Sequence, residues 1–437
     1  RRRTEVLQKT GEITMPKKLL ALFLVLTCAA SAITGCSSKN RVVNEDNQID
    51  QEIVTITFFG NKYEPENVIV IEQIISDFMR ENPSVRVSYE SLKGNDYFEA
   101  LEKRMEHGRG DDIFMVNHDV LLKLEADGQV ADLSGLSTLP DFTDEMRSQM
   151  GEGKITWVPT TVSIFGLYCN LDLLKEHKQE VPGTLSEWEA VCEYFVNCGI
   201  TPVIANNDIS LKTLAIGRGF WQVYQDKRQT EVFDQLNHGR ETLSEYLTDG
   251  FSIVETFIRR GYLDAEKTLN TKKTSDDLND FIRGESPFLL TGAWAAGRVA
   301  GMEPDFRFEV APLPILDEGS MLVINPDTRL SINAQSDHFE AAMKFVEYFT
   351  KAENIQKFAD QQSSFSPLKG GSPSSVLEIQ PLIACYESGQ TVIGTDDLLK
   401  LPIWELTAEV SRKLLAGEEL ESAMSWMDQQ AQERIVP

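Results

Sequence analysis

The chain has 437 residues, of which 41% are hydrophobic and 25% are charged, a composition typical of globular proteins. Because single hydrophobic cores rarely grow beyond about 250–300 residues, this length predicts two lobes. The formal net charge of −26 argues against nucleic acid as a partner, since such binding depends on Lys and Arg neutralising phosphates.

The first feature in chain order is a short apolar segment that ends at a cysteine. Lys17 and Lys18 precede an uncharged stretch over residues 19–34, and Gly35 and Cys36 follow it. A basic start, an apolar middle and small residues before the cleavage point are typical of a secretory signal peptide. The cysteine resembles that of the lipobox of bacterial lipoproteins, which is acylated and becomes the mature N-terminus. The alternative, a transmembrane helix, needs about 20 apolar residues, and this stretch is shorter.

We therefore expect residues 1–35 to be upstream sequence and a lipoprotein signal peptide, with Met15 as the start. Residues 36–50 are largely polar and are expected to form a lipidated tether. Together these segments predict a protein anchored by lipid to the cell membrane on its extracytoplasmic face.

Strand and helix patterns alternate after the tether. Runs rich in β-branched and aromatic residues predict strands over residues 53–59, 85–89 and 111–116. Apolar residues spaced near 3.6 predict helices between them, over 68–79 and 96–107. This alternation is typical of an α/β fold with a largely parallel sheet, in which ligands bind beyond the carboxyl ends of the strands.

The remainder of the chain repeats this alternation. Extended segments are expected over residues 155–170, 201–205, 288–290 and 330–333. Helices are expected after a capping sequence at 184–187 and over 338–349.

Four cysteines remain when the signal peptide is removed and Cys36 is acylated: Cys169, Cys192, Cys198 and Cys385. Cys192 and Cys198 are separated along a predicted helix by about 9 Å, beyond the reach of a disulfide, which needs less than about 7 Å. We expect all four to be buried thiols, with a Cys169–Cys385 disulfide as the open alternative. No Cys and His spacing matches a metal site, and neither a metal nor another cofactor is expected.

Several short motifs follow one another in a recognisable order. After the apolar segment and the opening strand, they occupy residues 111–114, 158–159, 166–170, 184–188, 199–202, 281–284 with Trp294, 331–334 and 341–348. In this order they resemble the extracellular solute-binding proteins of ABC importers, in the carbohydrate-binding group that includes maltose-binding protein. Cys169 departs from the family pattern, because an aromatic or hydrophobic residue is usual there, and this suggests a distant branch.

The resemblance implies a two-lobed, type II periplasmic-binding-protein-like α/β fold with discontinuous lobes, a hinge and a central ligand cleft. The N-lobe would comprise residues 51–163 plus 325–370, and the C-lobe residues 164–324 plus 371–437. The implied partners are a small carbohydrate and the transmembrane subunits of an ABC permease, with the protein a monomer held at the membrane by its lipid.

A sugar presents apolar C–H faces and hydroxyl groups, so its site needs flat aromatic rings and fixed polar groups. Trp294 follows an apolar strand through Thr291 and Gly292, which places it where ligands bind in such sheets. Trp221 and Trp404 are further aromatic candidates, whereas Trp188 and Trp426 fit helix packing better.

The polar candidates occupy strand ends and crossings. Asn61 follows the first strand, with turn formation as its alternative role, and Asn117 and Asp119 follow the third. Asp119 is expected either to accept from sugar hydroxyls or to cap the next helix, and His118 to lie at the surface. The resemblance adds Ser163 in the first crossing, and the remaining candidates are Asn206, Asn207, Ser364 and Phe365.

Enzyme chemistry is not expected. The five histidines are scattered, and the chain contains no H-E-x-x-H, no G-x-S-x-G and no G-x-x-x-x-G-K-[ST] sequence. Two other functions stay open on this fold: a lipoprotein sensor that reports a ligand to a membrane kinase, and a binding protein for a solute other than a sugar.

Overall fold

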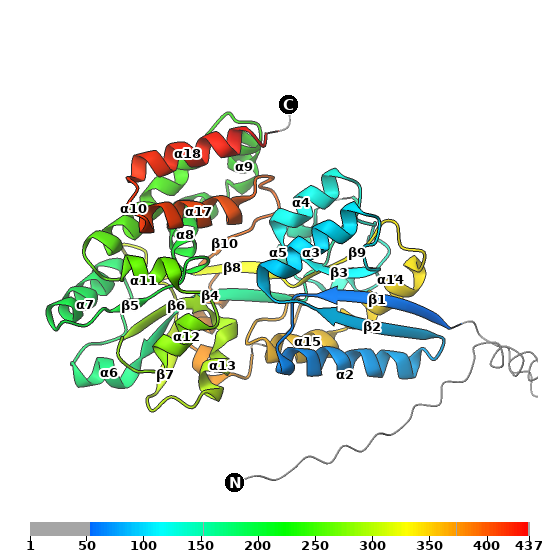
Figure 1. Ribbon diagram of the computed structural model, residues 1–437, viewed down its shortest axis with the longest axis horizontal. Coiled ribbons are helices and arrows are strands. Elements are labelled where there is room, and N and C mark those ends of the chain that lie inside the picture. The colour runs from blue at the N-terminus through cyan, green and yellow to red at the C-terminus, as the bar shows by residue number, and fades with distance from the viewer. Residues whose placement is uncertain (1–52, 152, 373, 436–437) are drawn as a thin grey trace, which may run out of the picture. The chain divides into compact units, whose positions relative to one another are not determined.

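The computed structural model describes residues 53–435 except 152 and 373 (Figure 1). The predicted signal peptide, Cys36 and the tether lie outside the described residues. The described residues belong to one compact unit that contains two β-sheets.

The first sheet forms where the early strands are predicted. β1 (Val54–Gly60) lies between β2 (Val85–Ser91) and β3 (Ile113–Val116) and runs parallel to both. β9 (Arg329–Ile332) completes the order β2-β1-β3-β9 and is antiparallel to β3. The predicted strands over 53–59, 85–89, 111–116 and 330–333 are confirmed to within two residues at each end.

Helices cover both faces of this sheet, with α2 and α15 on one side and α3 and α4 on the other (Figure 1). The apolar spacing of α2 buries Ile71, Ile74, Ile75 and Phe78, and the helix ends at Glu81, with Asn82 as its C-cap ahead of Pro83. This sheet and its helices form the first half of the molecule. The helices are α2 (Pro65–Glu81), α3 (Gly94–Glu106), α4 (His118–Ala126), α5 (Asp144–Met150), α14 (Phe339–Phe349) and α15 (Ala352–Gln361).

The second sheet has the order β10-β8-β4-β6-β5, with β7 also paired to β4. It is mixed rather than largely parallel, because β4 enters it from the first half while its neighbours run back toward that half. Only β10 with β8 and β5 with β6 are parallel pairs. Its strands are β4 (Thr161–Asn170), β5 (Val203–Ile204), β6 (Phe288–Gly292), β7 (Phe308–Ala311), β8 (Leu322–Asp327) and β10 (Thr391–Ile393).

The second sheet and the helices around it form the second half of the molecule, which is rich in helices. The predicted capping sequence opens α7, where the Thr184 hydroxyl accepts from the Glu187 N–H at 3.3 Å. The helices are α6 (Leu171–Glu176), α7 (Leu185–Asn197), α8 (Ser210–Gln225), α9 (Gln229–Asn237), α10 (Leu243–Arg259), α11 (Ala265–Asn270), α12 (Asp276–Phe281), α13 (Ala296–Gly301), α16 (Leu382–Glu387), α17 (Ile403–Leu415) and α18 (Leu420–Gln432). Short 3₁₀ turns occur at Leu139–Asp141, Ala293–Ala295 and Leu377–Ile379.

The chain passes between the two halves at β4, between β8 and β9, and again after α15. Isolated bridges join these passages, pairing Val158 with Leu330 and Val162 with Phe365. The lobe boundaries given by the resemblance stay a prediction.

The cysteine expectation is partly wrong. Cys169 and Cys192 are buried, but Cys385 is partly exposed and Cys198 is exposed, and all four are free thiols. Cys198 is exposed because it is the C-cap residue of α7, beyond the last turn that packs on the core.

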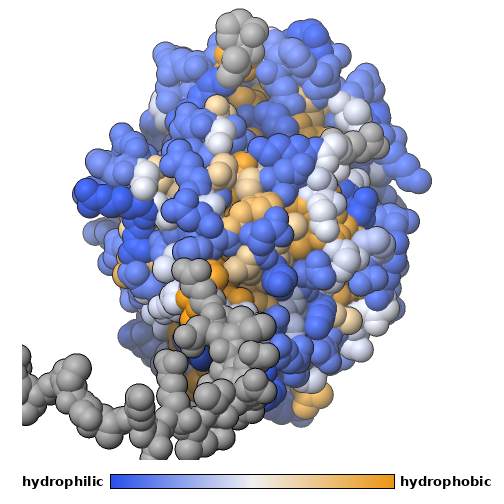
Figure 2. All heavy atoms as spheres, turned by 90° about the vertical axis from the view of Figure 1, so that its right-hand side faces the viewer, coloured by the Kyte–Doolittle hydropathy of each residue, from blue (hydrophilic) through white to orange (hydrophobic). Residues whose placement is uncertain are grey.

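The surface at the end formed by the first sheet carries mainly hydrophilic residues around a smaller hydrophobic area (Figure 2). The most exposed large apolar side chains, Ile53, Ile69 and Leu377, come from three separate segments. Within the described part of the chain, every helix is too short or too polar to cross a bilayer.

A buried arginine fixes the passage between the halves. Arg329, at the start of β9, is 1% exposed and lies with its guanidinium 3.8 Å from the centre of the Trp157 ring. The guanidinium donates to Asp397 Oδ1 at 3.2 Å and to the Thr395 carbonyl at 3.1 Å. Burial lowers the pKa of Arg329, and the Asp397 carboxylate opposes that effect. The strand that enters the first sheet is thereby tied to the segment that follows β10.

We predict that Arg329→Met lowers the free energy of unfolding by about 3 kcal/mol, because it leaves the Asp397 carboxylate buried without its main partner. Urea denaturation measures the change. Arg80→Met, which removes an exposed arginine paired with Asp77, is the control and should cost less than about 1 kcal/mol. Equal losses in the two variants would contradict a special role for the buried pair.

Candidate functional site

The directions of β1 and β3 in the first sheet and of β6 and β8 in the second bring the carboxyl ends of these strands to the junction between the two halves. β9 follows β8 into the first sheet, so β3 and β1, which run opposite to β9, point back toward the second half. β6 and β8 run toward the first half because both are antiparallel to β4. Ligands of α/β sheets bind beyond such strand ends, so this junction is the candidate site.

Two predicted tryptophans converge there on one phenylalanine. The Phe165 ring lies 5.1 Å from the Trp294 ring in an edge-to-face arrangement and 5.4 Å from the Trp404 ring. Trp294 folds back over Gly292, where a Cβ atom would lie only 2.1 Å from the indole. Both indoles are partly buried, so together they offer apolar ring surface at the junction.

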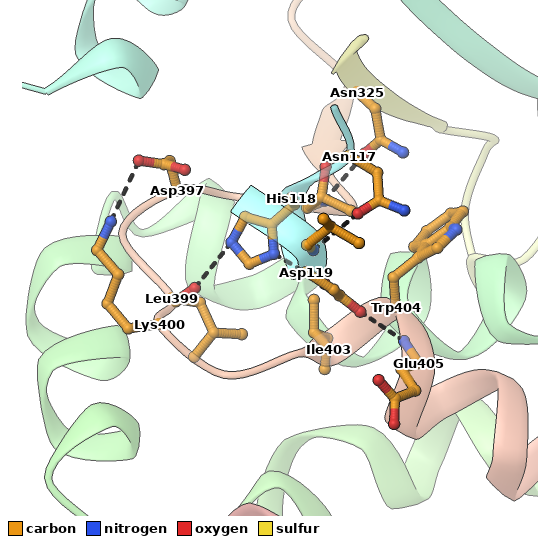
Figure 3. A network of polar contacts seen from close by, with 12 residues as sticks. Asn117, His118, Asp119, Asn325, Asp397, Leu399, Lys400, Ile403, Trp404 and Glu405 are labelled. Carbon is orange, nitrogen blue, oxygen red and sulfur yellow. Dashed lines mark hydrogen bonds and ion pairs between the residues drawn. The ribbon is translucent and has the colours of Figure 1, made fainter. Parts of the chain in front are cut away.

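Polar groups line the strand beside this aromatic cluster. Ser163 and Phe165 point to the same face of the sheet from β4, and Asn325 lies beside Ser163 on the neighbouring strand β8. Ser163 Oγ and Asn61 Oδ1 are buried without a hydrogen-bond partner among the described residues. Buried polar atoms are nearly always partnered, so both atoms suit a polar ligand. The amides of Asn117 and Asn325 extend on the side where the Trp404 indole lies (Figure 3).

Charged groups gather next to Asn61. Burial lowers the pKa of Lys62, while the carboxylates of Asp327 and Glu64 oppose that effect. Glu64 also pairs with Arg298 of α13 at 3.3 Å, which joins the loop after β1 to the second half. This side of the junction therefore contains Lys62, which directly follows Asn61 in the chain.

A second charged group lies under Trp404. Lys212 is 1% exposed, its Nζ lies 4.0 Å from the centre of the Trp404 ring, and it donates to the Trp404 carbonyl at 3.1 Å. It also pairs with Asp208 at 2.7 Å, and Asp208 in turn pairs with Lys273. Burial alone would raise the pKa of Asp208, but the two lysines hold it well below its usual range.

The structure corrects two expectations at the end of β3. His118 is 2% exposed rather than at the surface, because its ring packs between Asp119 and the carbonyl of Leu399 (Figure 3). The cap of α4 is Asn117, whose side chain accepts from the Val120 N–H at 2.8 Å. Asp119 instead accepts from the Glu405 N–H of α17, also at 2.8 Å.

The other predicted residues lie away from the aromatic cluster or are already bonded. Trp221 is on α8 and packs against the core of the second half. Asn206 is 1% exposed and donates to Asp277 at 2.9 Å, and Asn207 donates to the Leu269 carbonyl at 2.7 Å. Ser364 and Phe365 are buried in the passage after α15, where Phe365 pairs with Val162.

Four residues at the junction are absent from the sequence prediction: Lys62, Phe165, Lys212 and Asn325. Lys62 follows the end of β1, the same signal that identifies Asn61, whereas Asn325 lies within β8 and carries no such signal. Lys212 follows Leu211 and precedes Leu214 and Ala215 in a helix, and a lysine in so apolar a helical window is a usable signal of a buried charge.

A separate surface pocket of about 430 Å³ lies in the first half and shares no residue with the junction. Its lining includes Leu136, Leu139, Pro140, Arg147 and Ile155. Among the described residues, no group of His, Cys, Asp and Glu has the arrangement of a metal site.

Comparison with known proteins identifies the class. The model of the bacterial extracellular solute-binding protein family matches residues 73–381, and the chain belongs to this family. The chain has the two-lobed, type II α/β fold of these proteins, with one β-sheet in each half.

Among its relatives, the multiple sugar-binding protein of Streptococcus mutans serotype c is 26% identical over 381 residues, covering 84% of this chain and 86% of the relative. An uncharacterised lipoprotein of Streptomyces antibioticus is 24% identical, covering 70% and 69%. The solved structure of the solute-binding protein RafE in complex with raffinose has a TM-score of 0.70 at 22% identity, covering 88% of this chain and 100% of that one.

Lys212 gives a pH-dependent prediction. Burial lowers its pKa from 10.5 to about 8, against the opposing charge of Asp208. Between these values the unfolded chain keeps a proton that the folded protein has lost, so this group makes the free energy of unfolding rise with pH. Relative to Lys212→Met, the wild-type protein should gain roughly 2 kcal/mol between about pH 7.5 and about pH 10.

Urea denaturation of both proteins at the two pH values tests this. Lys123→Met removes an exposed lysine and controls for the loss of one positive charge. An identical pH dependence of the free energy of unfolding in the wild type and in Lys212→Met would show that burial does not lower the pKa of Lys212.

Proposed function

We propose that the protein captures a sugar or oligosaccharide at the junction of its two halves and delivers it to an ABC permease. The observation that carries this proposal is the convergence of Trp294 and Trp404 on Phe165, beside the Ser163 hydroxyl, which has no hydrogen-bond partner within the described part of the chain. The names of relatives support it, since one is a multiple sugar-binding protein and one solved neighbour contains raffinose.

The chemistry of the junction suits a sugar. The partly buried indoles of Trp294 and Trp404 offer flat surfaces for C–H faces. Asn61, Ser163, Asn117 and Asn325 offer oxygen and amide groups for hydroxyls, and Lys62 adds a charged donor. Asn61 and Asn117 follow strands of the first sheet, so a ligand that also stacks on the tryptophans contacts both halves.

Hinge closure follows from that double contact. A ligand that contacts both lobes binds the closed form better and shifts the equilibrium toward it. We propose the lobes to be residues 51–163 plus 325–370 and residues 164–324 plus 371–437, and the permease to recognise the closed form of a monomer. The binding protein itself would need no cofactor and would catalyse no reaction.

We also propose that the mature protein starts at Cys36 and is anchored by lipid at the extracytoplasmic face of the membrane. Each buried CH₂ of an acyl chain contributes about 0.8 kcal/mol, and one chain alone binds only marginally, so two acyl chains on Cys36 would hold the protein firmly. The lipoprotein among the relatives supports this assignment.

Thermal-shift screening of the protein against a panel of glycans, followed by calorimetry of any hit, tests the proposed ligand class. We expect at least one mono- or oligosaccharide to raise the melting temperature, because ligand that binds only the folded state stabilises it. A shift with amino acids or peptides and with no glycan would overturn the proposal.

Trp294→Ala should lower the affinity for that glycan at least tenfold, about 1.4 kcal/mol, with little loss of folding stability. Calorimetry measures the affinity, and thermal unfolding measures the stability. Trp426→Ala is the matched control, because Trp426 is also partly buried but packs on α18 against the core of the second half. Unchanged affinity in Trp294→Ala would remove Trp294 from the site.

A further inference from the structure

The helix that carries Trp404 is capped from the opposite half of the molecule. The first N–H groups of a helix have no partner within it, and a side-chain oxygen usually accepts from one of them. α17 begins at Ile403, after Pro402, which supplies no side-chain cap. Asp119 of α4 supplies the acceptor instead, since its Oδ2 receives the Glu405 N–H at 2.8 Å.

His118 fixes the orientation of this carboxylate. Its Nδ1 lies 2.9 Å from Asp119 Oδ1, and its Nε2 lies 3.0 Å from the carbonyl of Leu399, in the segment that leads into α17. Both partners are oxygen atoms, and each ring nitrogen of His118 lies within hydrogen-bonding distance of one of them. The pair therefore holds the start of α17 at two points, Leu399 and Glu405.

Asp119 has little capacity left for a ligand. One carboxylate oxygen faces His118, the other accepts from Glu405, and the side chain is 10% exposed. Figure 3 shows the carboxylate directed at α17, next to Trp404. Because the side chain is this deeply buried, little of the carboxylate is open to a sugar hydroxyl.

The cap also sets Trp404 relative to the first half. Lys212, Phe165 and Gly394, which support the indole, all belong to segments of the second half. Asp119 holds the residue directly after Trp404 and belongs to the first half. The Asp119–Glu405 hydrogen bond thus ties the ring position to the arrangement of the two halves.

We propose that Asp119, oriented by His118, is a positioning residue that holds Trp404 for ligand stacking and does not itself bind the ligand. The inference rests on the proposed function, because it assigns a role within the same site. It makes a specific energetic claim: the effect of Asp119 on affinity passes through the Trp404 ring.

A double-mutant cycle between Asp119→Ala and Trp404→Ala tests this claim, with calorimetric affinity for a glycan identified in the screen. Asp119→Ala should weaken binding about fivefold to tenfold, the size expected for a lost helix cap. In the Trp404→Ala background the same change should alter affinity by less than about twofold, because the ring that it positions is gone.

Two further variants test the role of the hydrogen bonds made by Asp119 and His118. Asp119→Asn keeps an oxygen acceptor for the Glu405 N–H and should retain most of the affinity. His118→Phe keeps an aromatic ring of similar size but removes both ring nitrogens, and it should weaken binding only when Trp404 is present. His118→Phe also serves as the test if Asp119→Ala does not fold.

Asp428→Ala is the matched control. Asp428 of α18 accepts from the Ser244 N–H of α10 at 3.0 Å, so it too caps one helix from another, but entirely within the second half. This variant should lose stability in thermal unfolding and keep its affinity within about twofold.

Additive effects of Asp119→Ala and Trp404→Ala would overturn the inference, since they would indicate direct contact between Asp119 and the ligand. Weakened binding in Asp428→Ala would overturn it too, because any lost cap would then suffice. If the wild-type protein binds no glycan, the proposed function fails, and amide hydrogen exchange at Glu405 decides the inference. Unchanged exchange in Asp119→Ala would then overturn it.

Discussion

The site depends on β4, the strand that carries the chain from the first half into the sheet of the second half. This strand is buried along its whole length, and it pairs with β8 through its first five residues and with β6 and β7 through the rest. Because a strand alternates its side chains, one face of β4 presents Ser163 and Phe165 together. The strand therefore places a hydroxyl and an aromatic ring side by side at the junction, and both tryptophans pack against that ring.

Local patterns predict most of the elements. The 3.6-residue spacing of Ile71, Ile74, Ile75 and Phe78 predicts α2, and the apolar run before Trp294 predicts β6 and places the tryptophan at its carboxyl end. The mixed direction of the second sheet is not predictable in this way, because direction depends on how distant strands return to β4. Periodicity describes which residues face a core, but it says nothing about which strands become neighbours.

The polar contacts at the junction show a stronger limit. Asp119 and Glu405 are 286 residues apart in sequence, and His118 and Leu399 are 281 apart. Sequence reasoning treats Asp119 as a ligand group or a local cap, because both roles need only nearby residues. The nearby cap position belongs to Asn117, and the carboxylate caps a helix that the chain forms much later. The contact with Leu399, far away in sequence, likewise explains why His118 is buried although it is polar and directly follows a strand.

Gly292 has a consequence for the ligand selectivity of the proposed site. The indole of Trp294 lies where a side chain at position 292 would begin, so the ring can occupy this place only because glycine has no Cβ atom. Even an alanine there would have to displace the ring. In the proposed site, position 292 therefore helps to set where the Trp294 ring lies, so a change of selectivity can be sought there as well as at the ring itself.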